Sequence, residues 1–509
     1  MNAIVVLPIV VPLTAAVISL LGWSSLRFQR LAAIIGGGLH LVAAIGLLVA
    51  VWNGGVLAVQ AGNWVAPFGI TLVADHLSAA MVMITGVIGF AVALYALGSL
   101  DRGRERFGFY PLYHLLIMSV TGAFLTGDIF NLYVWFEVML ITSFALMVLG
   151  NGREQLRGGL TYVTINLVSS TVFLAAVGLL YGATGTLNMA DLAVRLPQVA
   201  SPGLVTTLAT LFLIVFGVKA AVFPLFFWLP ASYHAPPVAI SAVFAGLLTK
   251  VGVYALLRVF TLLFTNDVAY THGIILAAAG LTMIVGVLGA ASQTEVRKIL
   301  SFHIISQIGY MIMGLGLFTR LALAGSVFYI LHHIVVKTNL FLISGLMRRA
   351  GGSFELEQLG GLYRSHPALS LLFLIPALSL AGLPPLSGFW AKLYLVQAGL
   401  ETEQYVMVFV ALAVGLLTLY SMTKIWALAF WKPAPVRDTT AASADRVADR
   451  VAAAKMRFST QCYVSVAALA LLTVLIGLWA SPRASRAQPA ATDLVEPERY
   501  LDAVLRARR

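Results

Sequence analysis

Long apolar runs recur along the whole chain, and this repetition constrains the fold more than any other feature. A membrane-spanning α-helix needs about 20 consecutive apolar residues. Fourteen such runs lie near residues 3–22, 31–52, 77–99, 110–126, 129–149, 161–181, 204–230, 238–260, 272–290, 300–317, 321–345, 369–396, 405–430 and 461–480. The sequence therefore predicts an all-α, polytopic membrane protein with about fourteen transmembrane helices.

The composition excludes most other classes of protein. Hydrophobic residues make up 60% of the 509 residues and charged residues only 10%, whereas a typical soluble domain carries about 25% charged residues. The net charge is +12, but the basic residues are few and lie between apolar runs, so we expect no nucleic-acid partner. The single cysteine, Cys462, excludes a disulfide framework and a cysteine-ligated metal site. We expect no cofactor and no metal. We also expect no cleavable signal peptide, because no basic residue precedes the first apolar run.

The positions of Lys and Arg in the loops predict an orientation. Basic residues concentrate in the loops after odd-numbered runs, whereas the loops after even-numbered runs contain only Arg195 and Arg320. The positive-inside rule then places the basic loops in the cytoplasm and both termini outside. The C-terminal tail opposes this rule and leaves its own side open, since it contains Arg483, Arg486, Arg499, Arg506, Arg508 and Arg509.

Two segments outside the apolar runs differ from them in composition. The segment 53–76 is rich in turn-forming residues and partly alternating, which indicates an external β-hairpin. The segment 432–460 carries most of the charge in the middle of the chain, and we interpret it as a cytoplasmic linker or a surface helix. Asp75 and Asp128 lie at membrane edges. They are candidates for ion entry points, but helix capping or loop solvation is the favoured role.

Several charged side chains lie inside the apolar runs, where each costs about 2.5–3.5 kcal/mol if it is ionised and faces lipid. For Arg258 we favour snorkelling or local pairing. A purely structural role does not account for the others, and buried acids and lysines alter one another's pKa values, as a proton path requires. The candidates within the runs are Glu137, Lys219, Lys250, Lys337, Lys392 and Lys424.

Histidines extend this set, because histidine titrates near neutral pH. His332, His333 and Lys337 share one run, and His333 lies four residues before Lys337, on the same helix face. His303 and Gln307 are related in the same way, and His234 follows the proline break at Pro230. A metal site needs three or four ligands and is disfavoured. His40 and His114 are interpreted as hydrogen-bonded core residues.

A duplication is visible in the spacing of prolines and lysines. The seventh run contains Lys219, Pro224 and Pro230, and Lys250 follows in the eighth. The twelfth run contains Pro376, the pair Pro384–Pro385 and Lys392, and Lys424 follows in the thirteenth. The broken runs are five apart, which predicts two repeats of opposite topology, as in secondary transporters. The expected parts are 1–109 (three N-terminal spans), 110–260 and 272–430 (the inverted repeats), 431–460 (the linker), 461–480 (the last span) and 481–509 (the tail).

The motifs resemble the antiporter-like subunits of respiratory complex I and of Mrp-type multisubunit cation/proton antiporters. The similarity is clearest to the D-subunit branch of the Mrp family, near its potassium-efflux members. The similarity is strong over the fourth to thirteenth runs, and the remaining runs resemble the family in length and layout. The matching stretches are WFEV at 135–138, KAAVFP at 219–224, WLP at 228–230, HAPP at 234–237, AGLLTKVGVY at 245–254 and LPPLSGFWAK at 383–392.

The resemblance implies that Glu137 and Lys219 form the key pair, with the carboxylate modulating the pKa of the lysine. It also implies that Lys250 connects through His332 or Lys337 to Lys392, where some complex I relatives carry an acid. A transporter subunit is expected, not an enzyme, in the bacterial cell membrane and in a hetero-oligomer with other Mrp-type subunits. Three alternatives stay open: a cation/proton antiporter subunit, a proton-pumping subunit of an NADH:quinone oxidoreductase, and a scaffold that conducts no ion. The sequence does not distinguish Na⁺ from K⁺, nor show whether the cation passes through this subunit.

Overall fold

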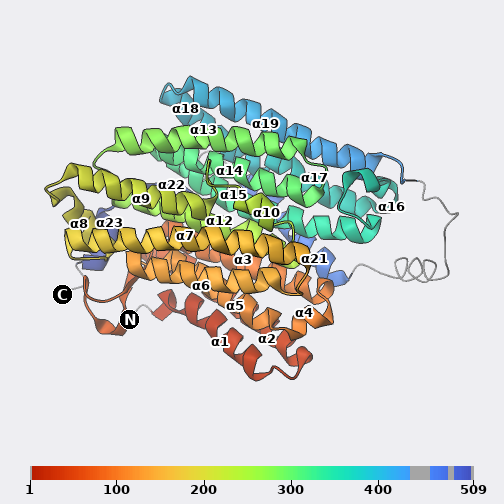
Figure 1. The fold of residues 1–509 in the computed structure, drawn as a ribbon, viewed down its shortest axis with the longest axis horizontal. Helices are drawn as coiled ribbons and strands as arrows, with labels where there is room; N and C mark the ends of the chain where they lie inside the picture. Colours follow the sequence, from red (N-terminus) through yellow and green to blue (C-terminus); the bar gives the residue numbers. More distant parts are fainter. Residues whose placement is uncertain (1–2, 436–458, 480–486, 506–509) are drawn as a thin grey trace.

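The structure, a computed structural model, describes residues 3–435, 459–479 and 487–505. Long helices lie side by side along the longest axis of the molecule (Figure 1). Most of the predicted linker and part of the predicted tail fall outside the described residues. The N-terminal part contains η1 (Ala3–Val5), α1 (Leu7–Leu21), α2 (Leu26–Gly54), β1 (Leu57–Gln60), η2 (Ala61–Asn63), β2 (Thr71–Ala74), α3 (His76–Ser99) and α4 (Arg102–Arg106).

The middle of the chain forms most of the bundle. Its first stretch contains α5 (Phe109–Leu125), α6 (Ile129–Val148), α7 (Arg153–Thr184), α8 (Met189–Arg195), η3 (Leu196–Gln198), α9 (Pro202–Ala220), α10 (Trp228–Ser232), α11 (Val238–Val243), the π-helical η4 (Phe244–Leu248) and α12 (Thr249–Leu262). Its second stretch contains α13 (Val268–Ser292), α14 (Val296–Leu317), α15 (Arg320–Gly351), η5 (Leu356–Gln358), α16 (Leu362–Ser365), α17 (Pro367–Ala381), α18 (Ser387–Glu401), α19 (Tyr405–Ile425) and the π-helical η6 (Trp426–Trp431). The chain closes with α21 (Thr460–Trp479), α22 (Ala487–Val495) and α23 (Glu498–Leu505).

The helices bear out the prediction of a polytopic, mostly helical membrane protein. Among the described residues, 11 helices are long and apolar enough to cross a membrane, and α1, α5 and α17 are shorter apolar helices. These three coincide with the remaining predicted spans, so the number fourteen stays a prediction. The predicted hairpin is confirmed, because β1 and β2 pair in antiparallel register with Leu57 opposite Ala74.

Polar residues at the membrane edges start many of these helices. Asp75 caps α3 by accepting from the Ser78 N–H, and Asp128 caps α6 by accepting from the Asn131 N–H at 2.7 Å. Side-chain oxygens at such positions satisfy backbone donors that have no partner within the helix. The expected capping role of both aspartates is therefore confirmed.

Both predicted helix breaks are present. The seventh span ends as a helix at Ala220, where Ala221 adopts a left-handed conformation with φ 62°, and resumes as α10 at Trp228. The twelfth ends at Ala381, with Gly382 at φ 93°, and resumes as α18 at Ser387. Pro376 does not break its helix, since α17 continues through it. Within a packed membrane bundle, neighbouring groups compensate for the hydrogen bond that an isolated proline removes.

The most buried helices lie at the centre of the bundle. The apolar stretch of α11–α12 is 100% buried and those of α14 and α15 are 89% buried, whereas those of α2 and α19 are 33% buried. The central helices carry Lys250, His303, His332, His333 and Lys337. The core of the fold thus contains the unusual polar residues, and the peripheral helices present apolar faces to their surroundings.

The two ends of the bundle differ. Figure 1 places α4 and α16 at one end, called here the α4 end, and α8 and α23 at the other, called the α8 end. The α4 end carries basic loop residues such as Arg104, Arg348 and Arg364. The described residues of the C-terminal tail pack at the α8 end, where α23 contacts α8 and β1.

Candidate functional site

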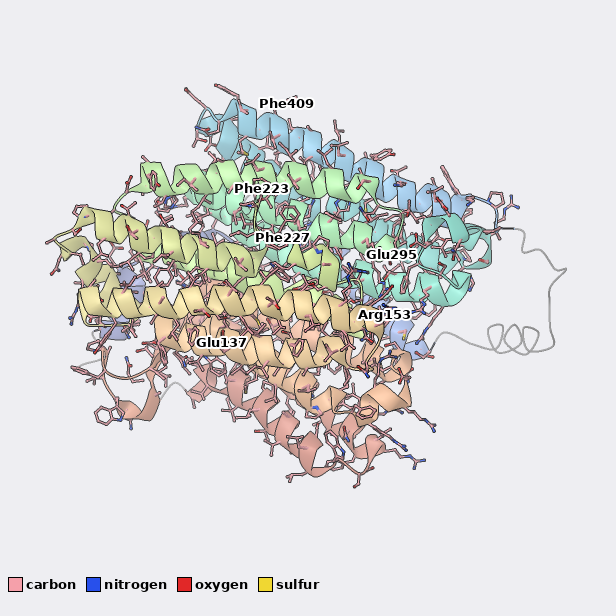
Figure 2. The ribbon with its side chains drawn as sticks, viewed as in Figure 1. Glu137, Arg153, Phe223, Phe227, Glu295 and Phe409 are labelled. Atoms are coloured by element: carbon pink, nitrogen blue, oxygen red, sulfur yellow. The ribbon has the colours of Figure 1, made fainter. Side chains whose placement is uncertain are left out.

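Glu137 and Lys219 are joined by a third side chain, Ser170. The Ser170 hydroxyl donates to the Glu137 carboxylate and accepts from Nζ of Lys219 at 3.0 Å. Among the described residues, Glu137 and Lys219 form no direct ion pair. The three residues come from α6, α7 and α9, and Glu137 is half-buried. In Figure 2 Glu137 lies farther from the α4 end than Arg153 and Glu295 do.

The broken helix α9 determines the surroundings of Lys219. This lysine lies in the last turn of α9, and its Nζ also donates to the Asn166 carbonyl at 3.4 Å. Nζ lies 5.5 Å from the centre of the Phe136 ring, whose face attracts a cation. Trp228, beyond the break, donates to the Val218 carbonyl at 3.0 Å, so protein groups satisfy backbone oxygens that the break frees.

Lys250 and Lys337 are fully buried in the centre of the bundle. Nζ of Lys250 donates to the Ala245 carbonyl in η4, where the π-helical turn displaces the regular backbone hydrogen bonds. Nζ of Lys337 lies 3.4 Å from the Leu300 carbonyl of α14. The two lysines are close enough to interact electrostatically.

Three buried histidines lie between these lysines and Lys392. His303 lies on α14, which packs against α12 with its Lys250, and His333 lies on α15, which packs against α18 with its Lys392. The His332 ring contacts the Ser387 hydroxyl through Nδ1 at 2.8 Å. Both ring nitrogens of His303 and of His333 lack a hydrogen-bonding partner within the described part of the chain. Buried polar atoms of this kind are ordinarily satisfied by water.

Lys392 binds the end of the second broken helix. Its Nζ donates to the carbonyls of Leu380 and Ala381 at 3.1 and 2.8 Å, and it lies 5.1 Å from the centre of the Tyr310 ring. A helix C-terminus carries partial negative charge, which favours a cation there. The break before α18 therefore creates the binding place for this amine.

Two predicted residues lie apart from the buried set. Lys424 is half-buried, and its Nζ donates to the Ala291 and Gln293 carbonyls at 3.0 and 2.8 Å, at the end of α13. His234 lines a cavity of about 790 Å³ at the α4 end, together with Arg104, Glu154, Glu295, Arg297, Lys298 and Arg348. Burial lowers the pKa of His234 from its usual value, against the opposing effect of the Glu295 carboxylate.

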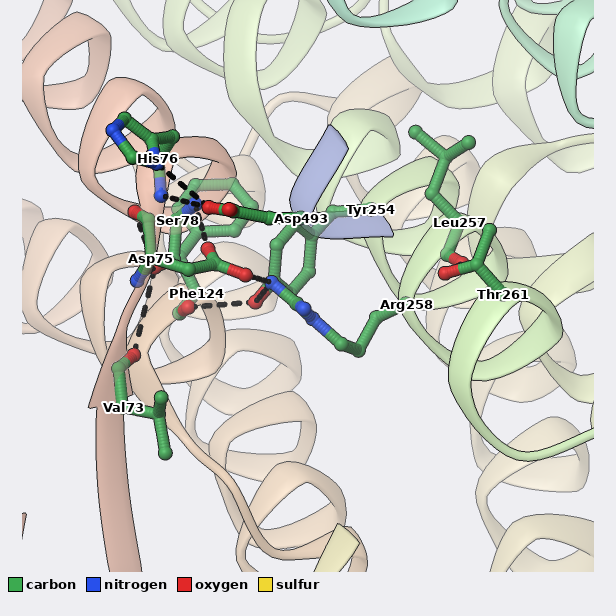
Figure 3. Close-up of polar contacts among 10 residues, drawn as sticks. All are labelled: Val73, Asp75, His76, Ser78, Phe124, Tyr254, Leu257, Arg258, Thr261 and Asp493. Atoms are coloured by element: carbon green, nitrogen blue, oxygen red, sulfur yellow. Dashed lines mark hydrogen bonds and ion pairs between the residues drawn. The ribbon is translucent and has the colours of Figure 1, made fainter. Parts of the chain in front are cut away.

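Arg258 is locally paired, as expected. It forms a buried ion pair with Asp75 at 2.5 Å (Figure 3). Its guanidinium also lies 5.2 Å from the centre of the Tyr500 ring of the tail. Burial raises the pKa of Asp75, but Arg258 and the Ser78 N–H outweigh it and hold the pKa below its usual value. His40 contacts Thr121 at 3.3 Å in the core, in accordance with its interpretation as a packed residue.

The sequence did not single out Ser170, Asn166, Ser387 or Tyr310, which contact the buried amines and histidines. Small hydroxyl side chains occur throughout the apolar runs, so nothing in the pattern distinguishes Ser170 from its neighbours. Within the described ranges, no group of three or more His, Cys, Asp or Glu side chains is placed to hold a metal ion.

Comparison with known proteins agrees with this architecture. Residues 126–418 match the family described as NADH:quinone oxidoreductase/Mrp antiporter, transmembrane. The chain is 45% identical to the D-type subunit of the Na⁺/H⁺ antiporter of Alkalihalophilus pseudofirmus, over 99% of this chain and 100% of that protein. It is 39% identical to the protein of the same name from Bacillus subtilis, over 99% and 100%.

A solved structure extends the similarity to three dimensions. A chain of the Mrp complex from Dietzia sp. DQ12-45-1b superposes with a TM-score of 0.89 at 33% identity, covering 99% of this chain and 100% of that one. The curated relatives and the fold agree over nearly the whole length, and the family match lies within it at residues 126–418. The chain therefore belongs to the NADH:quinone oxidoreductase/Mrp antiporter family of membrane subunits, in the branch of the D-type antiporter subunits.

Proposed function

We propose that this chain is the proton-translocating membrane subunit of a multisubunit cation/proton antiporter that exchanges Na⁺ or K⁺ for H⁺. The observation that carries the proposal is the chain of contacts from Glu137 through Ser170 to Lys219 inside the bundle. It joins an acid and an amine through a hydroxyl that can both accept and donate a proton. Relatives named as Na⁺/H⁺ antiporter subunits support the transport reaction.

The proposed proton path continues through the centre of the bundle. From Lys219 it reaches Lys250, then the histidines and Lys337, and ends at Lys392 beside the second break. The packing of α9 against α12, of α12 against α14, and of α14 and α15 against α18 supports this order. The unpartnered nitrogens of His303 and His333 support a path that contains water.

Lys424 and His234 have peripheral roles in this proposal. His234 belongs to the cavity at the α4 end, which we assign as the cytoplasmic mouth because basic loops surround it. Lys424 belongs to the same end, since it contacts the last residues of α13, next to the first turn of α14 with Arg297 and Lys298. Both serve proton exchange with the cytoplasm in this scheme, whereas Lys392 serves the opposite side.

The inverted repeat supplies the two half-channels of the proposed path. Residues 110–260 and 272–430 each contain a helix that ends in a left-handed residue and resumes after a gap, at Ala221 and Gly382. Lys219 lies just before the first gap and Lys392 just after the second. Repeats of opposite topology place one such break toward each side of the membrane.

The proposed setting is a hetero-oligomer with other Mrp-type subunits in a bacterial cell membrane. The Dietzia relative is part of an Mrp complex, which supports the assembly. The apolar residues exposed on α2, α7 and α19, such as Leu39, Leu167 and Leu416, are suited to lipid or to partner helices.

The proposal is tested with everted membrane vesicles that contain the chain and all its neighbouring subunits. Addition of Na⁺, K⁺ or Li⁺ is expected to dissipate a respiration-driven pH gradient. Glu137→Ala and Lys219→Ala are each expected to abolish this response while the complex still assembles, because each removes one end of the bridged pair. Lys432→Ala is the matched control, since Lys432 lies at the surface of the α4 end and donates to the Glu357 carbonyl.

Undiminished antiport in assembled Glu137→Ala or Lys219→Ala complexes contradicts the proposed path. A wild-type complex that responds to no cation, but whose purified preparation reduces quinone with NADH, supports the respiratory-complex alternative. The cation that gives the largest response identifies the exchanged ion.

A further inference from the structure

Ser170 is the side chain that connects the acid to the amine, although it carries no charge of its own. We propose that Ser170 is the positioning residue and proton relay between Lys219 and Glu137, an inference that rests on the proposed function. The geometry that carries it is a directed chain of two hydrogen bonds through one oxygen atom.

The two hydrogen bonds run in one direction. Nζ of Lys219 donates to Oγ of Ser170, and the Ser170 hydroxyl donates to Oε1 of Glu137. A proton that leaves the Lys219 ammonium for Oγ is matched by the hydroxyl proton that passes to Glu137. The serine ends as a neutral hydroxyl, the lysine as an amine and the glutamate as a carboxylic acid, so charge and protons balance. After the transfer the hydroxyl can rotate and reset the chain.

Burial and a second acceptor on α7 hold Lys219 in place beside Ser170. Ser170 and Lys219 are 3% and 5% exposed, so the contact between them is shielded from bulk water, while Glu137 is half-buried. Asn166 lies one turn before Ser170 on the same face of α7, and its carbonyl accepts a second hydrogen bond from Lys219. α7 therefore presents the amine with two oxygen acceptors, of which only the Ser170 hydroxyl can pass on a proton.

Ser169 provides a matched control in the same helix. It is also buried, 4% exposed, but its hydroxyl donates to the Val215 carbonyl at 3.2 Å and contacts neither Glu137 nor Lys219. Replacing either serine by alanine removes one hydroxyl from the same turn of α7. A loss common to both variants thus reports packing, and a loss confined to Ser170 reports the bridge.

The experiment measures cation-dependent antiport in vesicles for S170A, S170T, S170C and S169A, across the pH range, with the yield of assembled complex. We expect S170A to lower the initial rate at least about tenfold, since proton transfer by a positioned group contributes about 10²-fold or more. The pH profile of S170A is expected to differ from that of wild type. S170T is expected to restore both the rate and the pH profile, and S169A to resemble wild type. S170C, a near-isosteric change to a weak donor and acceptor, is expected to be intermediate and to remain informative if S170A does not assemble.

Wild-type rate and pH profile in assembled S170A or S170C complexes overturn the relay. Equal losses in S169A and S170A overturn it as well, because packing then explains both. E137A and K219A are measured beside them. If those two variants retain antiport, the proposed function fails. If they lose it while S170A does not, only the relay fails.

Discussion

At the scale of single residues, the lysines within the bundle share one mode of stabilisation, although Lys392 and Lys424 are only half-buried. Each donates to backbone carbonyls: Lys219 to Asn166, Lys250 to Ala245, Lys337 to Leu300, Lys392 to Leu380 and Ala381, and Lys424 to Ala291 and Gln293. Arg258 instead forms a buried ion pair with Asp75. Carbonyl dipoles hold an amine without a fixed countercharge, so they suit a group that must release its proton, whereas a full ion pair suits a structural contact.

Asp128 provides a prediction about pH at this scale. Burial raises the pKa of this helix-capping carboxyl to about 6, above the unfolded value of about 3.9. A group whose pKa is raised on folding stabilises the fold below its unfolded pKa, and this contribution is lost as pH rises through about 6. Asp128→Asn keeps a capping oxygen and is expected to stabilise the protein at pH 8 by up to about 3 kcal/mol, with little effect near pH 4.

The measurement is the melting temperature of the purified complex between pH 4.5 and 8. Asp267→Asn is the control, because Asp267 caps α13 in the same way but is exposed. A pH-independent difference between Asp128→Asn and wild type contradicts the assignment.

Whether a functional residue could be predicted from the sequence depends on its charge. Glu137, Lys219 and Lys250 are conspicuous because charge is rare in apolar runs and costly in lipid. Ser170 is not, since hydroxyl groups are tolerated in membrane helices by bonding to the preceding turn, as Thr142 and Thr418 do here. The bridging role depends on which face of α7 meets α6 and α9, and one sequence does not specify that contact.

At the scale of elements, glycine permits the close approach of the second broken helix to its neighbours. A Cβ atom at Gly388, in the first turn of α18, would overlap the Ser379 carbonyl oxygen and lie 2.9 Å from Nε2 of His332. Gly388→Ala is therefore expected to push α18 away from α17 and α15. We expect about 1–3 kcal/mol of destabilisation, as for overpacked cores, and a loss of antiport from the displaced Lys392.

Gly178→Ala is the matched control, because a Cβ there meets no atom within 4 Å. Alanine at this helical position is expected to be neutral or to stabilise α7 by up to about 1 kcal/mol. The measurements are the melting temperature and antiport of both variants. Equal behaviour of the two variants would show that Gly388 is not a packing constraint.

The elements themselves were only partly predictable. The hairpin and both breaks follow from turn residues and proline pairs, whereas Pro376 shows that one proline does not end a helix inside a packed bundle. The short helices α22 and α23 have 9 and 8 residues, well below the length of an apolar span. They are recognisable only by their packing on α15 and α8.

At the scale of the whole molecule, the C-terminal tail pairs with one of the arginines that oppose the predicted orientation. The loops after even-numbered runs contain Arg195 and Arg320, and both are paired, with Asp191 and with Glu496 of the tail. The tail packs α22 against α15 and α3, so its position at the α8 end depends on folded contacts that a count of loop charges does not include.

Two ion pairs hold the described part of the tail, residues 487–505, and they differ in burial and therefore in expected strength. Asp493 pairs with His76 at 2.7 Å with 2% and 12% of the side chains exposed, whereas Glu496 and Arg320 are 47% and 57% exposed. Exposed pairs contribute about 0–1 kcal/mol, but removing one partner of a buried pair costs about 3–5 kcal/mol. Asp493→Ala is therefore expected to lower the melting temperature of the complex and to make the tail accessible to protease from the α8 side, and Glu496→Ala to do neither. Equal protease accessibility in the two variants would show that the tail is held by the apolar faces of α22 and α23 alone.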